Sequence, residues 1–350
     1  SSSSRGLGDV YKRQYFNTPN QEFLSKKIAS LENGEKALIF TSGMAAISTS
    51  IMANVKSGDH VIFQEDLYGG TRNFIKTEFD KYGIEYSFTK GLESEDFTNE
   101  IRDNTVGIYV ETPSNPLLKI VDLKSISSVA KENSIWTMID NTFASPVNQN
   151  PIDHGIDIVI HSATKYLGGH SDISAGAVVS TEKNINLILN SAKNFGGNLS
   201  DYTVWLLERS MKTLFIRVRE QTNNAKLLAK MLEENSNISR VYYPGLESHP
   251  SYLIAKNQMK DFGAMMSFDL NENIDVYKFL KNLKVVKPGM SLAGVETTVN
   301  FPMKTSHGLL TQDERDNQGI GNKLIRLSVG IESYKDLFND LDQAIKNSLI

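Results

Sequence analysis

The chain has 350 residues, with 37 Lys and Arg against 41 Asp and Glu, six His and no Cys, so its formal net charge is −4 at neutral pH. This length predicts two domains with a large core, and the mild acidic balance argues against a nucleic-acid partner, whose binding surface would be basic. The lack of Cys excludes disulfides, thiolate nucleophiles and Cys-ligated metals and fits a cytoplasmic protein, and no apolar run approaches the ~20 residues that a membrane span needs.

The first residues differ from those that follow. Residues 1–14 begin with four serines and continue with glycines and basic residues, without apolar periodicity. We interpret residues 1–16 as an N-terminal arm that is non-native or disordered. An amphipathic pattern then predicts a helix over residues 21–32, which ends at Asn33-Gly34.

Short apolar runs alternate with amphipathic stretches over residues 37–180. Helical periodicity falls on residues 45–55, 71–82 and 123–132. The runs that we expect to be strands are 37–40, 60–63, 85–88, 106–111, 136–140, 157–162 and 175–180. This alternation predicts an α/β fold whose mainly parallel, seven-stranded sheet is covered by helices on both faces.

The pattern changes near Asp201. Residues 202–234 form one long helical stretch with few breakers, and the turn Pro244-Gly245 follows it. The later apolar runs are 264–270, 283–286 and 325–329, and the later helical stretches are 274–282 and 334–348. We therefore expect a large domain over residues 17–235 and a smaller C-terminal α+β domain over residues 236–350, joined by the long helix.

Four chemically active residue groups follow predicted strands, where ligands bind in open α/β sheets. The Ser42-Gly43 corner opens a helix and offers backbone N–H groups to an anion. Asp140 ends a buried strand, Lys165 follows another, and Asn115 lies between two prolines. Taken alone, each group also fits an ordinary structure: a capped turn, a helix cap, a solvated lysine or a rigid surface loop.

The combination of these groups is more specific than any one of them. A phosphate corner, an Asp and a Lys in this chain order fit pyridoxal 5'-phosphate, which forms a Schiff base with a lysine and needs an acidic partner for its pyridinium nitrogen. With Asp140 holding that nitrogen protonated, the ring absorbs the electrons released when a Cα–H bond breaks.

Longer motifs around these residues resemble a known family. They are YGGT at 68–71, ETPSNP at 111–116, DNT at 140–142, SATKYLGGHSD at 162–172 and SLAGVE at 291–296. From about Asn17 to the C-terminus the chain resembles the Cys/Met-metabolism family of pyridoxal-phosphate enzymes, which includes cystathionine γ-synthases, cystathionine β- and γ-lyases and methionine γ-lyases. The resemblance implies the PLP-dependent transferase fold type I and a homotetramer built as a dimer of dimers.

The resemblance also implies roles for individual residues, and it implies that none of them binds a metal. Lys165 would hold the cofactor and move protons between substrate carbons, Asp140 would pair with the ring nitrogen, and Tyr68 would stack on the ring; these three are the expected catalytic residues. Ser291 and Arg326 would grip the carboxylate of an amino-acid substrate. Further expected cofactor contacts are Ser42, Gly43, Met44, Asn115, Thr142, Ser162 and Thr164, of which Asn115 would also contact the substrate.

Two positions depart from the family pattern. The family carries a Tyr-x-Arg pair that reaches the cofactor phosphate of the neighbouring subunit, and here Tyr11-Lys12-Arg13 stands one residue early relative to Asn17. Met290 precedes Ser291, where cystathionine γ-synthases and γ-lyases commonly carry an acidic residue. The apolar side chain there weakens the γ-synthase interpretation.

The expected function is a PLP-dependent trans-sulfuration enzyme that cleaves or forms C–S bonds of cystathionine-like amino acids. We favour a cystathionine β- or γ-lyase, with γ-synthase as the alternative. Methionine γ-lyase ranks last, because that enzyme typically carries a Cys beside the stacking tyrosine and this chain has Gly69-Gly70. A catalytically impaired binding protein on the same fold and a plain aminotransferase are the remaining alternatives.

Overall fold

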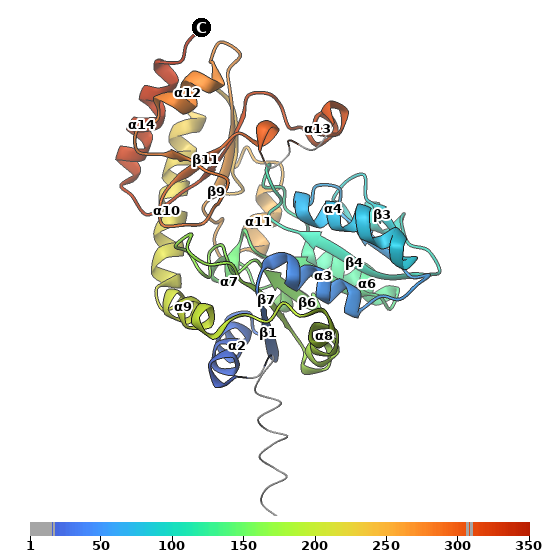
Figure 1. Ribbon diagram of the computed structural model, residues 1–350. Coiled ribbons are helices and arrows are strands. Elements are labelled where there is room, and N and C mark those ends of the chain that lie inside the picture. The colour runs from blue at the N-terminus through green and yellow to red at the C-terminus, as the bar shows by residue number, and fades with distance from the viewer. Residues whose placement is uncertain (1–15, 17, 306–307, 309–310) are drawn as a thin grey trace, which may run out of the picture.

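The computed structural model describes residue 16, residues 18–305, residue 308 and residues 311–350. All seven strands expected over residues 37–180 form, and each begins and ends within one residue of its expected position. They are β1 (Lys36–Phe40), β2 (His60–Phe63), β3 (Glu85–Phe88), β4 (Thr105–Glu111), β5 (Trp136–Asp140), β6 (Ile158–His161) and β7 (Gly176–Ser180). They make one sheet in the order β1-β7-β6-β5-β4-β2-β3 (Figure 1).

The centre of this sheet is parallel. Strands β3, β2, β4, β5 and β6 run in one direction, and β7 pairs antiparallel with both β6 and β1. Helices cover both faces of a parallel sheet, so its central strands are buried on both sides. This is why these strands are nearly continuous apolar runs in the sequence. One face packs against α3 (Gly43–Ala53) and α8 (Glu182–Phe195), and the other against α2 (Pro19–Leu31) and α6 (Leu123–Glu132). The expected α/β class is confirmed.

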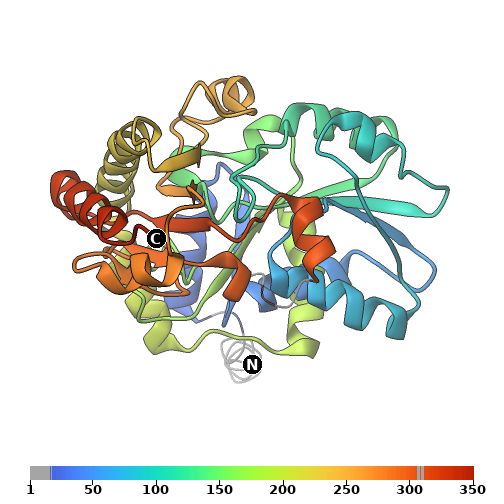
Figure 2. The ribbon, with the colours of Figure 1, turned by 90° about the horizontal axis from the view of Figure 1, so that it is seen from above.

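A second sheet of five strands lies beside the first (Figures 1 and 2). Its order is β10 (Lys287–Pro288), β11 (Thr298–Asn300), β12 (Leu324–Ser328), β9 (Met265–Leu270) and β8 (Ile238–Tyr242). Two of its strands, β9 and β12, match expected runs, while β8, β10 and β11 were not expected because they are short or alternate with polar residues. Helix α10 (Leu214–Glu233) packs against β8 and β9, and α14 (Tyr334–Lys346) packs against α10 and α12 (Val276–Asn282).

Shorter helices complete the described part of the chain. They are α4 (Gly69–Glu78), η1 (Phe79–Tyr82), α5 (Ser94–Thr98), α7 (Ser145–Asn148), η2 (Pro151–His154), α11 (Tyr252–Gln258), η3 (Pro302–Lys304) and α13 (Gln312–Gln318). The stretch 71–82, which was expected to be one helix, consists of α4 followed by the 3₁₀ helix η1. Within the described residues, no helix has both the length and the apolar character that a membrane crossing requires.

The prediction of a single long helix over residues 202–234 is wrong. The structure has α9 (Asp201–Met211) and α10, separated at Lys212-Thr213. The break exposes the Ser210 carbonyl, which accepts hydrogen bonds from the buried Arg217 guanidinium at 3.1 Å and from the Thr213 hydroxyl at 3.1 Å. The same guanidinium donates to the Tyr166 carbonyl at 3.0 Å. A tertiary contact therefore ends α9, and periodicity alone does not reveal it.

The apolar run at residues 283–286 does not form a strand. This stretch is a loop in which the backbone N–H groups of Lys284, Val285 and Val286 donate to the Asp340 carboxylate at 2.8–3.1 Å. The carboxylate is buried at the middle of α14. Its oxygens replace the carbonyl partners that a neighbouring strand would supply.

We predict that Asp340→Ala lowers the free energy of unfolding by about 3 kcal/mol, because it leaves three backbone donors of a packed loop without an acceptor. Urea denaturation followed by circular dichroism measures the change. Asp336→Ala, in the exposed first turn of the same helix, is the matched control and should cost less than about 1 kcal/mol. Equal effects of the two changes would contradict this account of the loop.

Candidate active site

One cavity of about 660 Å³ lies where the carboxyl ends of the large sheet meet the second sheet. Every site residue expected within the described part of the chain lines it. These residues are Ser42, Gly43, Met44, Tyr68, Asn115, Asp140, Thr142, Ser162, Thr164, Lys165, Ser291 and Arg326. Tyr11 and Arg13 lie outside the described residues. The cavity thus collects side chains from segments as far apart in sequence as Ser42 and Arg326.

The start of α3 forms a cradle for an anion. Ser42 is the N-cap, and its hydroxyl accepts the Ala45 N–H at 3.0 Å. The N–H groups of Gly43 and Met44 have no intrahelical acceptor at this position. A Cβ on Gly43 would lie 2.8 Å from the Cβ of Ser162, so glycine is needed for the close approach of the two loops. The free N–H groups and the helix dipole suit a phosphate.

Hydroxyl groups fix the loop that carries Lys165. The Thr142 hydroxyl accepts the Ser162 N–H at 2.8 Å, and the Thr164 hydroxyl accepts the Ala175 N–H at 3.0 Å. Burial lowers the pKa of Lys165, and the positive charge of Arg326 lowers it further. A lowered pKa increases the share of neutral amine, which is the nucleophilic form.

Two carboxylates stand side by side at the end of the large sheet. Glu111 is the last residue of β4 and pairs in register with Asp140, the last residue of β5. Asp140 accepts the Thr142 N–H at 3.0 Å, and Glu111 accepts the Tyr68 N–H at 2.8 Å. Burial raises the pKa of both groups, and the Asp140 charge raises the pKa of Glu111 further. Hydrogen bonds from Thr142 and the charge of His161 work against the rise at Asp140.

Glu111 has no role among those that the family resemblance implies, although it lies in the motif ETPSNP at residues 111–116. Glu111 ends one buried apolar strand just as Asp140 ends the next. In a parallel sheet such residues reach the same edge. The position of Glu111 at the end of a strand was therefore the signal in the sequence for a place in the site. To use it, one would have had to know that β4 pairs with β5.

The second sheet contributes a guanidinium to the cavity. Arg326 lies on β12 and is buried; it donates to the Asn115 side-chain oxygen at 3.0 Å and to the Met290 carbonyl at 3.1 Å. Its Nε–H has no partner in the described structure, and burial lowers the pKa of Arg326 to about 10. A buried donor without an acceptor suits the carboxylate of a ligand.

Tyr68 also lines the cavity. It precedes α4, and the residue is 47% exposed. A Cβ on Gly70 would lie 2.5 Å from the Tyr68 ring and 3.1 Å from the Met44 sulfur. The glycine therefore lets the aromatic ring lie across the start of the helix, close to Met44.

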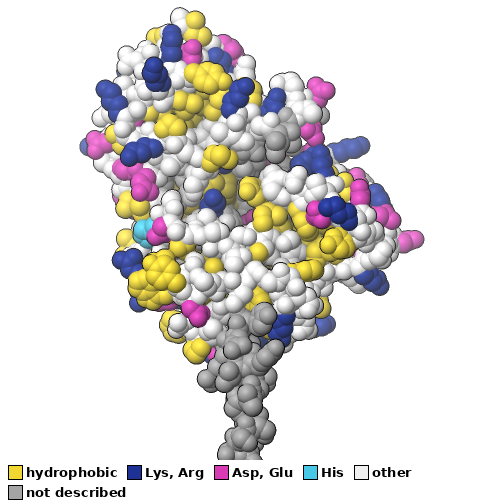
Figure 3. All heavy atoms as spheres, viewed as in Figure 1, with side chains coloured by type: hydrophobic (Ala, Val, Ile, Leu, Met, Phe, Trp, Pro, Cys, Tyr) yellow, Lys and Arg dark blue, Asp and Glu magenta, His cyan; other side chains and the backbone are white. Residues whose placement is uncertain are grey.

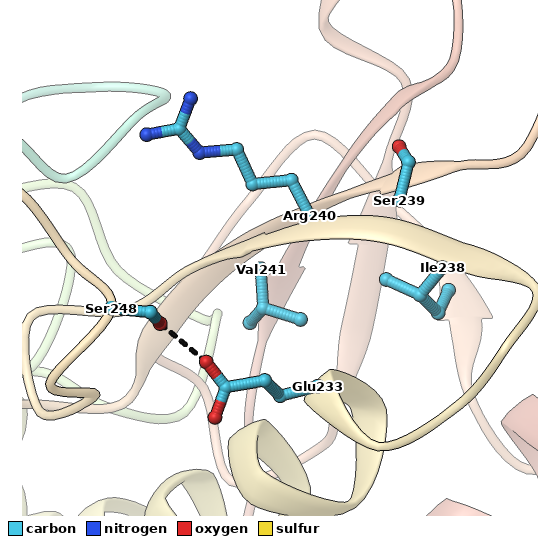
Figure 4. Close-up of a pocket in the computed structure, with 6 residues that line it drawn as sticks. All are labelled: Glu233, Ile238, Ser239, Arg240, Val241 and Ser248. Atoms are coloured by element: carbon cyan, nitrogen blue, oxygen red, sulfur yellow. Dashed lines mark hydrogen bonds between the residues drawn. The ribbon is translucent and has the colours of Figure 1, made fainter.

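A smaller cavity of about 160 Å³ near β8 differs in character (Figure 4). Glu233 accepts a hydrogen bond from the Ser248 hydroxyl, and the Arg240 guanidinium points away from this pair (Figure 4). Its polar groups do not converge on a common point. It offers no arrangement comparable to that around Lys165.

A family model described as Cys/Met metabolism PLP-dependent enzyme matches residues 2–346. The chain belongs to this family. The resemblance seen in the sequence is thereby confirmed, and pyridoxal phosphate is the cofactor. The match also includes residues 2–16, which the sequence analysis set aside as an arm.

Individual relatives of the family cover most of the chain. It is 41% identical to the cystathionine beta-lyase of Lactococcus lactis subsp. cremoris over 97% of this chain and 90% of that protein. It is 42% identical to the cystathionine gamma-lyase of Bacillus subtilis over 94% of this chain and 87% of that protein. Among solved structures, cystathionine gamma-lyase from Lactobacillus plantarum complexed with L-serine superposes with a TM-score of 0.92 at 37% identity, covering 95% of this chain and 87% of that one.

The residues of this PLP enzyme fit its cofactor. The cradle at Gly43 and Met44 suits a phosphate, and a buried carboxylate faces the same cavity as an amine of lowered pKa. The unpartnered Nε–H of Arg326 leaves one donor for a bound anion. An anion cradle, a carboxylate and a nucleophilic lysine are the protein groups that pyridoxal phosphate uses.

We predict that Arg326→Gln slows covalent capture of pyridoxal phosphate by the apoenzyme at neutral pH several-fold. Removing the positive charge raises the pKa of Lys165, so less of the amine is neutral, and the capture rate should recover at higher pH. Arg326→Lys keeps a positive charge and should leave the pH profile close to that of the unchanged protein. Stopped-flow absorbance measures the rate, and superposable profiles for all three proteins would contradict the assignment.

Proposed function

We propose that this enzyme is a cystathionine β- or γ-lyase, which releases a thiol from a cystathionine-like amino acid. The observation that carries the proposal is the convergence of Lys165, Asp140 and the unpartnered Nε–H of Arg326 on one cavity. It is supported by relatives of about 40% identity with these two activities in their names.

Asp140 and Lys165 serve the reactive atoms of the cofactor in this proposal. When bound, pyridoxal phosphate supplies an electron sink for the bonds that break at the substrate Cα. Asp140 would be the carboxylate that favours the protonated form of the ring nitrogen. Lys165 would hold the cofactor through Nζ, and the same Nζ, when free, would be the base that takes the proton from the substrate Cα.

Other residues orient the substrate. The Arg326 guanidinium, held by Asn115 and the Met290 carbonyl, has its Nε–H left to bind the substrate carboxylate. Ser291, beside it in the cavity wall, adds a hydroxyl. The Tyr68 hydroxyl exchanges a proton with the substrate or the leaving group. Ser162 and Thr164 join the α3 cradle in holding the phosphate.

Few residues separate the lyases of cystathionine from the other activities of the family. Met290 is 67% exposed beside Ser291, and its apolar side chain offers no carboxylate to the distal amino group of cystathionine. This disfavours the alternative, a cystathionine γ-synthase. The Gly69-Gly70 pair beside Tyr68, without a Cys, disfavours a methionine γ-lyase. Identities of 41% and 42% to a β-lyase and a γ-lyase do not separate those two activities.

A homotetramer, built as a dimer of dimers, is the proposed assembly. Large apolar side chains are exposed on α9 and the start of α10, and Figure 3 shows apolar side chains gathered at the lower left, where Figure 1 places α9. They are Tyr202, Trp205, Phe215 and Ile216, with 42–72% of each exposed. Apolar patches of this kind mark protein interfaces. The division into domains at residue 235 and the cytoplasmic location also remain proposals.

We predict that Lys165→Ala abolishes both the visible absorbance of the protein-bound cofactor and thiol release, because no other amine takes its place. Absorbance after gel filtration and a thiol assay measure the two effects. Lys193→Ala, on the last turn of α8, is the control and should retain both. A Lys165→Ala protein with full turnover would overturn the assignment.

Product analysis distinguishes the two lyase reactions. With cystathionine, β-cleavage yields homocysteine, pyruvate and ammonia, while γ-cleavage yields cysteine, 2-oxobutanoate and ammonia. We expect one of these sets, measured by liquid chromatography of the derivatised thiols and keto acids. Keto–amino exchange without thiol release would instead indicate an aminotransferase, and purified protein that remains colourless after incubation with pyridoxal phosphate would indicate a binding protein on the same fold.

A further inference from the structure

We propose that Glu111 is a positioning residue that carries a proton and anchors Tyr68, while its neighbour Asp140 is ionised. This inference rests on the role proposed above for Asp140 as the partner of the ring nitrogen. It assigns a function to a buried acid that the proposed mechanism does not otherwise use.

The two acids share one wall of the cavity. Strands β4 and β5 are parallel neighbours, and Glu111 and Asp140 are register partners at their ends. Only 4% of Glu111 and 7% of Asp140 are exposed. Two carboxylates this close and this deeply buried retain one proton between them, because like charges repel and burial disfavours each charged form.

Among the residues that the structure describes, neither acid forms an ion pair with a cation. The titratable groups that face Glu111 are Asp66 from the β2–α4 loop, Tyr68 before α4, Tyr109 on β4, Asp140 on β5 and, across the cavity, Lys165 and Arg326. Asp66 has its own cation, Lys119, at 3.3 Å. Asp66 therefore adds a negative charge near Glu111 and does not neutralise one.

The hydrogen bonds place the proton on Glu111. Asp140 accepts the Thr142 N–H and a bond from the Thr142 hydroxyl, and the charge of His161 also favours its ionised form. Within the described part of the chain, the Glu111 carboxyl group accepts one donor, the Tyr68 N–H at 2.8 Å. The ionised form is therefore better stabilised at Asp140, and the neutral form remains at Glu111.

A neutral Glu111 can anchor Tyr68 without competing with Asp140. Its backbone is held by the Gln64 side chain, which accepts the Glu111 N–H at 2.8 Å and donates to the Glu111 carbonyl at 2.9 Å. Its side-chain carbonyl oxygen then holds the Tyr68 N–H. Of the two acids, Asp140 then presents the one negative charge to the cavity, while the Tyr68 backbone stays anchored. A glutamine offers the same carbonyl oxygen, whereas an alanine does not.

The test compares the apoenzyme with Glu111→Gln and Glu111→Ala. Infrared difference spectra at neutral pH should show the carbonyl stretch of a protonated carboxyl group, which Glu111→Gln removes. Glu111→Gln should bind pyridoxal phosphate as tightly as the unchanged protein, and Glu111→Ala about tenfold more weakly, the size of one lost hydrogen bond. If no such band is lost, or if Glu111→Gln binds the cofactor as weakly as Glu111→Ala, the proposal is wrong.

The pH dependence of stability gives a second measurement. A native state that keeps a proton which the unfolded chain has released loses stability as pH rises above the ordinary carboxyl pKa of about 4.3. The melting temperature of the apoenzyme should therefore fall relative to that of Glu111→Gln between about pH 5 and pH 8. Parallel curves would contradict the proposal. These readings on apoenzyme stand whether or not the enzyme cleaves cystathionine, so failure here and failure of the proposed function are distinguishable.

Discussion

The active site depends on the burial of two carboxyl groups at one edge of a parallel sheet. Parallel strands end at a common edge, so Glu111 and Asp140 meet there without an ion-pair partner in the described structure. Such burial is costly unless polar groups compensate it. The N–H groups of Thr142 and Tyr68 supply part of the compensation, and a cationic ring nitrogen is the group that would complete it at Asp140.

The second sheet makes this edge into an amino-acid site. Arg326 comes from β12, and Asn115 meets its guanidinium from the large sheet. A different guanidinium, Arg217, ties the break between α9 and α10 to the Tyr166 carbonyl, next to Lys165. The reactive lysine loop and the second sheet are therefore held by arginines that use carbonyl and amide oxygens, not carboxylates, as partners. The arrangement leaves the Arg326 Nε–H open to a substrate.

The sequence predicted the large sheet more accurately than the second one. Most of the runs of β1–β7 are apolar on both faces because helices cover both sides, so each of these runs is visible without its neighbours. The edge strand β3, whose first residue Glu85 is exposed, departs from this pattern. The short strands β8, β10 and β11 depend on their pairing partners. The loop at residues 283–286 is apolar like a strand, but the Asp340 carboxylate on α14 takes its N–H groups. The end of α9 likewise follows from Arg217, a contact outside the local pattern.

By itself the sequence determined the fold class, the cofactor and the residues that line the cavity, because strand ends and family motifs are local features of the chain. It marked Lys165, Asp140 and Arg326 without showing how they act on one another. Only the tertiary structure decided that Arg326 lowers the pKa of Lys165 and that Glu111 stands beside Asp140. Electrostatic effects depend on distance and burial, and both arise when the strands pair and the two sheets meet.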